Sequence, residues 1–248
     1  MQLNLLVTCY NSSSEMLGFQ DWLIPIVTQF EKIVLVDDYS TDTSAEYLSA
    51  LERNFDNIEV VFRNENSGRP SLPRNDGLAR LPSVGRVIFL DIDDRIPYSY
   101  INFLKKANSE DGYSGVKYVT DVSDFDPTIR CSFDRKRIIS ARQLSRKNHI
   151  VFSGSSLPLS AAKTVKFINS PLEDWLYWQA IVRDGLRFSR LLTVPVAYNN
   201  DITLSPNKFR QIRRVYRHLG FGLLVYFAEV LRIKFEELSL AIVLRKKS

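Results

Sequence analysis

The sequence predicts an α/β fold in three layers, with helices on both sides of a mostly parallel sheet. Two observations lead to this prediction. Through the first hundred residues, short apolar runs of strand length alternate with segments whose apolar residues recur at helical spacing. Acidic residues directly follow two of the apolar runs, at the strand ends where open α/β sheets bind ligands. The strand–helix–strand order requires crossover connections, and these give parallel strands covered by helices.

Seven elements are predicted in this first part, and several have a clear local signal. Residues 16–30 have apolar side chains at helical spacing, and Pro25 is expected to kink this helix. Asp42 or Thr43 can cap the next helix, and Pro82 ends a short third one. The predicted strands are residues 3–8, 33–36, 58–62 and 87–90, and the predicted helices are residues 16–30, 43–55 and 74–81.

The second part of the chain is less regular. Residues 115–122 have the composition of a strand, and residues 172–183 form a helical pattern that Asp184 and Gly185 end. Residues 186–198 also have a strand-like composition. Pro195 lies inside this segment and predicts an edge strand or a break, because proline cannot donate to a sheet.

Composition excludes several classes of protein. The chain has 248 residues, of which 45% are hydrophobic and 25% charged, which is typical of a soluble globular protein and argues against disorder. Two cysteines are too few for a disulfide scaffold, and two histidines argue against a zinc site. Any metal would therefore be held by carboxylates. The start of the chain has no signal-peptide pattern, and the apolar run 219–228 is too short for a membrane span, so we expect a cytoplasmic protein.

Polar residues gather where three predicted strands end. The first strand ends in residues 8–11, the second in Asp37 and Asp38, and the fourth in residues 91–94, which read D-I-D-D. Like charges this close repel one another unless a cation lies among them. A divalent cation with oxygen ligands would serve, and it would also hold phosphates. Phosphatases of the haloacid type begin similarly, but they have Thr or Val where this chain has Arg95.

Four segments, in this order, resemble the motifs of family 2 glycosyltransferases. Together they extend over roughly residues 3–205, and the ordered set is far more specific than any one of them. The segment at residues 66–77 has one extra residue and Pro73 in place of alanine. The matches are V-L-V-D-D-Y-S-T-D at 34–42, N-S-G-R-P-S-L-P-R-N-D-G at 66–77, F-L-D-I-D-D at 89–94, and G-S-S at 154–156 followed by L-E-D at 172–174.

The resemblance implies the GT-A fold and a division of the chain. Residues 1–207 would form the glycosyltransferase domain, with a nucleotide-sugar-binding half at 1–95 and an acceptor-binding half at 96–207. Residues 208–248 would form a basic, amphipathic helical tail. The implied activity is transfer of a sugar, with inversion, from a UDP-sugar to a hydroxyl of a glycan or lipid-linked acceptor, in the synthesis of a bacterial surface polysaccharide.

The resemblance also assigns the donor site. Thr8 and Tyr10 match positions that contact the nucleotide base, and a tyrosine ring is suited to stacking. Asp38, with Asp37 beside it, matches the carboxylate that accepts a hydrogen bond from uracil. Arg74 matches a basic residue near the diphosphate.

The metal and the catalytic base follow from the same motifs. Asp91 and Asp93 match the D-x-D pair that holds the ribose and a divalent metal, Mn²⁺ or Mg²⁺, with Asp93 as the first choice for metal contact and Asp94 as its rival. Asp174, next to Glu173, matches the base that takes the proton of the acceptor hydroxyl.

Two alternatives stay open at this point. A sugar nucleotidyltransferase has a similar sheet, but it would need a glycine-rich, basic loop after the first strand. Residues 11–15 contain neither a glycine nor a basic residue. A non-catalytic relative would have lost the carboxylates, and all are present. One departure concerns the metal ligands, because the Tyr-Arg-x-His of many relatives is here Tyr-Asn-Asn-Asp at 198–201, where Asp201 could replace the histidine as a metal ligand.

Charge is unevenly spread along the chain. Residues 208–248 carry ten basic and three acidic residues, whereas the remaining 207 residues carry 23 basic and 25 acidic ones. The tail has an apolar stripe with basic clusters on both sides. This pattern predicts either a helix packed on its own domain or in a homodimer, or one lying on the anionic inner face of the cell membrane. It does not predict binding of nucleic acid.

Overall fold

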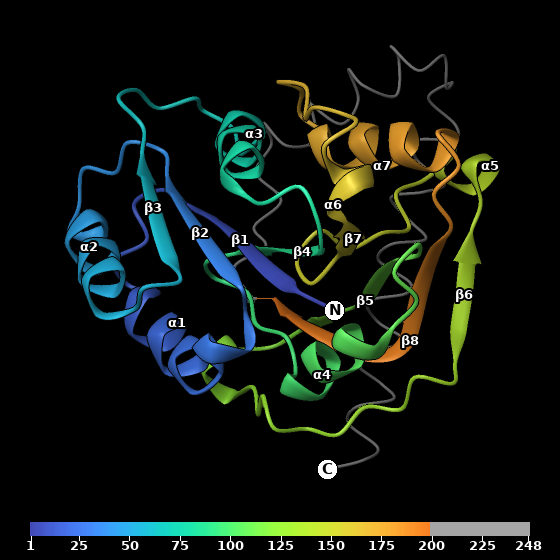
Figure 1. Ribbon diagram of the computed structural model, residues 1–248, viewed down its shortest axis with the longest axis horizontal. Helices are drawn as coiled ribbons and strands as arrows, with labels where there is room; N and C mark the ends of the chain where they lie inside the picture. The colour runs from blue at the N-terminus through green and yellow to red at the C-terminus, as the bar shows by residue number, and fades with distance from the viewer. Residues whose placement is uncertain (199–248) are drawn as a thin grey trace. The chain divides into compact units, whose positions relative to one another are not determined.

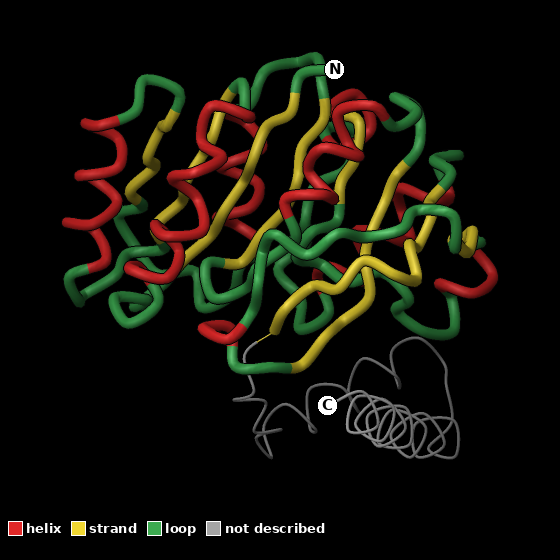
Figure 2. Tube along the Cα trace, turned by 90° about the horizontal axis from the view of Figure 1, so that it is seen from below, coloured by secondary structure: helices red, strands yellow, loops and turns green. Residues whose placement is uncertain are grey.

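The computed structural model describes residues 1–198, which form one mixed sheet of eight strands between two layers of helices (Figures 1 and 2). The strands lie in the order β3-β2-β1-β4-β7-β5-β8-β6. Their bounds are β1 Leu3–Cys9, β2 Lys32–Asp37, β3 Ile58–Phe62, β4 Arg86–Asp91, β5 Gly112–Val119, β6 Lys136–Ile139, β7 Ser156–Pro158 and β8 Phe188–Tyr198. The predicted α/β class is confirmed.

The first four strands are parallel, as predicted, and their register determines where the site forms. In β1, Thr8 lies opposite Val36 of β2 and opposite Asp91 of β4. The carboxyl ends of β2, β1 and β4 are therefore level with one another. This brings the polar residues that follow each strand to one edge of the sheet.

The helices of the first part follow the predicted ones with small shifts. The kinked helix is α1 (Met16–Leu23) followed by the 3₁₀ helix η1 (Ile24–Gln29), and Pro25 lies in the first turn of η1. The helix α2 (Ser44–Asn54) is close to its predicted bounds. The helix α3 (Ser71–Arg80) begins three residues earlier than predicted. Proline at position 73 does not prevent this, because the first turn of a helix needs no amide donor.

The second part contains elements that the sequence analysis missed. They are α4 (Tyr98–Lys106), η2 (Val122–Asp124), β6, α5 (Ala141–Leu144), β7 and α6 (Leu159–Ala162). Most of these have three or four residues, too few for a period to be visible. The helix α7 (Glu173–Arg183) matches its prediction.

The strand β8 pairs with a neighbouring strand on each side, although it contains Pro195. Its first residues, Phe188 to Leu191, pair with β6, whereas Pro195 lies beyond the end of that pairing. On the other side Pro195 lies opposite Val116 of β5, just after an irregularity in the register. The predicted edge position therefore holds locally, although β8 as a whole lies inside the sheet.

Each face of the sheet carries its own apolar core. In β1, Leu5 and Val7 face the core formed with α1, α2 and α4, and Leu6 faces the core formed with α3, α5, α6 and α7. Trp178 is fully buried in the second core and Trp175 is 2% exposed, so both tryptophans pack inside the protein.

No helix within residues 1–198 is long and apolar enough to cross a bilayer. The predicted amphipathic tail at 208–248 and the candidate ligand Asp201 lie outside the described residues.

Candidate active site

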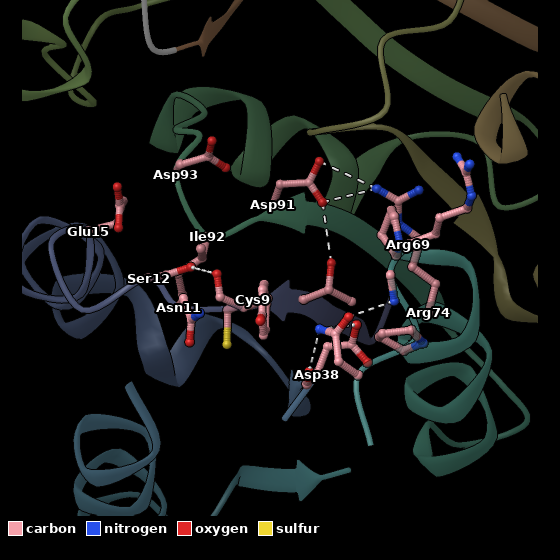
Figure 3. A pocket seen from close by; sticks show the side chains of 16 residues that line it. Cys9, Asn11, Ser12, Glu15, Asp38, Arg69, Arg74, Asp91, Ile92 and Asp93 are labelled. Carbon is pink, nitrogen blue, oxygen red and sulfur yellow. Dashed lines mark hydrogen bonds and ion pairs between the residues drawn. The ribbon is translucent and has the colours of Figure 1, made fainter. Parts of the chain in front are cut away.

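A cavity of about 490 Å³ opens at the carboxyl ends of β1, β2 and β4 (Figure 3). Thr8, Tyr10, Asp38, Arg74, Asp91 and Asp93, all predicted site residues, line it together. The sheet register explains this convergence, because their strand ends are level. The other lining residues are Cys9, Asn11, Ser12, Glu15, Asn66, Gly68, Arg69, Pro70, Pro73 and Ile92.

Arg74 joins two halves of this site. Its Nη2 donates to Asp91 Oδ1 at 3.1 Å, and its Nη1 donates to Glu173 Oε1 at 2.9 Å. The guanidinium also stacks on Phe152, with Cζ 3.4 Å from the ring centre. Only 4% of the Arg74 side chain is exposed. A buried, always-charged guanidinium with two fixed partners can hold both carboxylates in one geometry.

Asp91 is partly engaged and partly open. Thr8 Oγ1 donates to Asp91 Oδ1 at 3.3 Å, and Arg74 approaches the same oxygen. Even so, 31% of the Asp91 side chain stays exposed, and it faces the cavity. It can therefore accept hydrogen bonds from a bound ligand.

Asp93 and Asp94 point to different surroundings. Asp93 is exposed and lines the cavity, and Figure 3 shows it on the same side as Glu15. Partial desolvation and the charge of Asp91 raise the pKa of Asp93. Asp94 is only 2% exposed and accepts a hydrogen bond from Ser153. Burial, with the charges of Asp91 and Asp93, raises the pKa of Asp94.

Ser153 explains how the G-S-S region supports the acidic turn. Its hydroxyl donates to Asp94 and accepts from the Asp91 amide at 3.1 Å. The preceding strand is held as well, since Gly154 donates to the Phe89 carbonyl at 2.7 Å. Gly154 has a φ of 74°, which favours glycine at this position.

Asp37 and Asp38 also have separate surroundings. Asp37 is buried and accepts hydrogen bonds from the amide and hydroxyl of Ser40, and it is not among the cavity residues. Asp38 lines the cavity and accepts from Arg63, from the Ser67 hydroxyl at 2.7 Å and from the Ser67 amide at 3.1 Å. The loop after β3 therefore fixes the Asp38 carboxylate at the cavity wall.

The loops after β1 and β2 hold strained residues. Asn11 has a φ of 48° and Tyr39 a φ of 67°, in the left-handed region that non-glycine residues rarely adopt. Asn11 Oδ1 accepts from the Thr41 amide at 2.8 Å, which ties the two loops together. Such strain is kept where surrounding contacts impose it, often at functional sites. Tyr10, the residue before Asn11, is 48% exposed and lines the cavity.

The candidate base is at the first turn of α7. Glu173 is 9% exposed and pairs with Arg74, while Asp174 Oδ2 accepts from Asn148 Nδ2 at 2.9 Å. Burial raises the pKa of both carboxyls, against the lowering effect of Arg74. Asp174 does not line the cavity itself, but it adjoins Glu173, which Arg74 joins to Asp91.

The sequence model of the protein family Glycosyl transferase family 2 matches residues 5–156 of this chain. These residues include the whole cavity lining. This chain belongs to glycosyl transferase family 2.

Two curated relatives match part of this family 2 chain. It is 31% identical over 116 residues to a poly(ribitol-phosphate) beta-glucosyltransferase of Bacillus spizizenii, covering 44% of the chain and 18% of the relative. It is 31% identical over 113 residues to a teichoic acid poly(glycerol phosphate) polymerase of Staphylococcus epidermidis, covering 45% of the chain and 15% of the relative. The chain thus matches less than a fifth of either relative's length.

Solved structures confirm the GT-A fold of this family 2 chain. S. aureus TarS 1-349 in complex with UDP-GlcNAc has a TM-score of 0.63 at 19% identity, over 87% of this chain and 65% of that one. The mannosyltransferase PcManGT from Pyrobaculum calidifontis in complex with GDP-Man and Mn²⁺ has a TM-score of 0.59 at 15% identity, over 93% of this chain and 64% of that one. At these identities the likeness concerns the fold.

The carboxylates of the family 2 site suit a metal ion that is bound partly by the protein and partly by a substrate. Within residues 1–198, no three His, Cys, Asp or Glu side chains form a ready metal-binding group. Asp93 is an exposed carboxylate in the cavity, and Asp91 is next to it but engaged by Arg74. Mg²⁺ and similar ions bind through one or two carboxylates together with phosphates and water, and this set fits that pattern.

Sequence reasoning missed several residues of the site. Glu15, Arg69 and Asn66 line the cavity, and Arg63 holds Asp38. Asn66 and Arg69 lie inside the family 2 segment at 66–77, so the motif could have indicated them. Nothing in the sequence signals Arg63 or Glu15, because their roles depend on loops that meet only in the folded chain.

Proposed function

We propose that this chain is an inverting glycosyltransferase that moves a sugar from a UDP-sugar to a hydroxyl of a polyol-phosphate acceptor of the teichoic-acid type. The observation that carries the proposal is the arrangement around Arg74. One buried guanidinium contacts Asp91, at the nucleotide end of the site, and Glu173, next to the candidate base Asp174. This arrangement supports a donor site and a base that act together.

The residues of the cavity suit a nucleotide. Tyr10 offers an exposed ring for the base, and Asp38 is a fixed acceptor at the wall. Asp91 can accept from the ribose hydroxyls, and Arg74 places a positive charge near the diphosphate. The UDP-GlcNAc bound to the TarS structure supports uridine as the base.

Asp93, with Asp91 beside it, would hold the divalent cation. When bound, Mn²⁺ or Mg²⁺ stabilises the charge that develops on the departing diphosphate. The Mn²⁺ bound to PcManGT supports this choice. Asp94 is less suitable than Asp93, because it is buried and bonded to Ser153.

Asp174 acts as the general base in a single displacement. The acceptor oxygen forms a bond to the anomeric carbon while the bond from that carbon to the diphosphate oxygen breaks. The electron pair of the broken bond leaves with the diphosphate, and the hydroxyl proton passes to Asp174. Asn148 orients the base, and the raised pKa of Asp174 makes it a better proton acceptor.

The acceptor class rests on the curated relatives, whose names specify poly(ribitol phosphate) and poly(glycerol phosphate). We propose that the enzyme acts on the cytoplasmic side of the cell membrane, with the basic tail at 208–248 as a peripheral anchor or a dimer contact. Flotation with anionic and neutral vesicles, at low and high salt, tests the anchor.

Calorimetry tests the donor site. UDP should bind with Mn²⁺ or Mg²⁺ present and weaken with EDTA, and Asp93→Asn should remove this difference. Asp56→Asn is the control, because Asp56 is an exposed carboxylate that lines neither this cavity nor the neighbouring one that Asp93 also lines. Equal affinity with and without chelator would contradict the metal proposal.

A transfer assay tests the chemistry separately. Asp174→Asn should keep UDP affinity and lower turnover by about 10²–10⁴-fold, the contribution expected of a general base. Near wild-type turnover in this variant would mean that the base is another group.

A further inference from the structure

The edge of the sheet next to the base carries an unusual charge. Residues 135–147 contain six basic side chains and no acidic one. The segment comprises the edge strand β6, the helix α5 with Ser140 as its N-cap, and the turn after α5 (Figure 1). We define the basic edge as the five exposed basic side chains of this segment: Arg135, Lys136, Arg137, Arg142 and Arg146.

The basic edge lacks the ion pairs that other basic residues of the protein make. Elsewhere, Lys32 pairs with Glu59, Arg63 with Asp38 and Asp76, and Arg187 with Asp111. None of the five basic-edge side chains forms an ion pair with another residue in the described range 1–198. Their charges are therefore available to an anionic partner.

The basic edge leads directly to the candidate base. Trp175, the residue after Asp174, donates from Nε1 to the Leu144 carbonyl at 2.6 Å. Asn148, just after the basic segment, donates to Asp174 itself at 2.9 Å. The turn that carries Arg146 therefore lies against the first turn of α7, and Figure 1 shows α5 beside α7.

Protection against aggregation explains only part of this pattern. Charged residues on an edge strand prevent pairing with another sheet, which would account for Lys136 and Arg137 on β6. It does not account for Arg142 and Arg146, which lie on α5 and the turn after it, next to or between Leu144 and Asn148, two residues that contact α7. A charge row that runs from the edge strand to the base fits a partner that extends along it.

We infer that the basic edge is an acceptor track, which binds the phosphodiester backbone of a polyanionic acceptor and leads one of its hydroxyls to Asp174. The phosphates of a polyol-phosphate chain repeat along its length, so several can meet Lys or Arg at once. This inference rests on the proposed function for its acceptor class. The surface itself rests on charge and on the contacts to α7.

A binding experiment with a labelled poly(ribitol phosphate) chain tests the track. Arg142→Gln/Arg146→Gln should weaken binding of the chain by about 10-fold at low salt, with a smaller effect at high salt, since these contacts are screened. Arg53→Gln/Lys106→Gln is the matched control. It removes two exposed basic residues from α2 and α4, away from the basic edge, and should bind the chain like the wild type.

Three outcomes decide the inference. Unchanged binding in Arg142→Gln/Arg146→Gln would overturn it. Loss of binding to phosphatidylglycerol vesicles in that variant, with no loss for the polymer, would also overturn it and would make the edge a membrane surface. Selective loss of polymer binding, with UDP affinity unchanged, supports it. If the wild-type protein binds no UDP, the proposed function fails, whereas the track is still judged by polymer binding.

Discussion

Arg74 on α3 and Glu173 on α7 are joined by a hydrogen bond of 2.9 Å although they lie 99 residues apart in the chain. The same guanidinium holds Asp91 at the end of β4. Because all three groups are partly or fully withdrawn from water, none can lose its partner without a cost in free energy. The two halves of the site thus depend on one side chain.

Removal of this cation should destabilise the protein. Arg74→Gln leaves Glu173 buried without its partner, so the free energy of unfolding should fall by about 3–5 kcal/mol in urea titrations. Arg80→Gln, on the same helix, is the control. Its ion pair with Glu59 spans 3.5 Å and 59% of its side chain is exposed, so its loss should cost about 0–1 kcal/mol. Equal losses in the two variants would mean that Arg74 is not the link between the halves.

Activity should fall on the acid side at a higher pH than for an ordinary aspartate. Burial raises the pKa of Asp174, and a general base must be deprotonated to act, so kcat/KM should decline as the pH falls through this raised value. For stability the sign is opposite. The folded state binds the proton more tightly, so the contribution of Asp174 is largest below the ordinary pKa and is lost as the pH rises through the raised one.

Asn148 offers a test of this assignment. Its hydrogen bond favours the charged form of Asp174 and lowers its pKa. Asn148→Ala should therefore move the acid limb of the pH–rate profile to higher pH, while Asn57→Ala, which breaks contacts from just before β3 to the Val27 and Phe30 carbonyls, should leave the limb in place. An unmoved limb in Asn148→Ala would assign the titration to another group.

The sequence predicted the parts of this fold and site that depend on local signals. Strand ends at Asp38 and Asp91 are visible because each follows an apolar run, and a parallel sheet must bring them together. The pairing of Arg74 with Glu173 is not visible, because it depends on how α3 and α7 pack on the same face of the sheet. The same is true of Arg63 and Asp38. The short elements β6 and α5 were missed for a different reason, since four residues show neither a strand nor a helix period.

Gly77 should tolerate no side chain. A Cβ at this position would lie 2.1 Å from Leu6 Cδ1, because α3 packs closely on β1. Gly77→Ala should therefore lower the free energy of unfolding by about 1–3 kcal/mol, as overpacking does. Gly18→Ala in α1 is the control. Its Cβ would meet only the end of the Arg95 side chain, at 3.3 Å, so the helix should be at least as stable as before. Thermal unfolding of both variants distinguishes the effect of the steric contact at Gly77 from the effect of alanine on helix propensity.

The role of Asp38 can be separated from that of its neighbour Asp37. If Asp38 accepts the N3–H of uracil, the wild-type protein should bind UDP about 10- to 100-fold more tightly than N3-methyl-UDP. This ratio corresponds to the free energy of one hydrogen bond to a charged group. Asp38→Ala should lose this discrimination. Asp37→Ala should keep it, because Asp37 bonds to Ser40 and does not line the cavity.

The contacts of Asp38 make this a demanding test. Arg63 and the Ser67 hydroxyl, the latter at 2.7 Å, already donate to its carboxylate, the Ser67 amide is shared between both oxygens at 3.1 Å, and Asn66 is 3.3 Å away. These donors take up most of the acceptor capacity of Asp38, and the long contact to Asn66 leaves the remaining capacity for a ligand. Equal affinity of the wild-type protein for UDP and its N3-methyl analogue would show that this capacity is unused. Asp38 would then serve only to anchor Arg63 and Ser67, and the base would be selected by Tyr10 and the loop at 66–70.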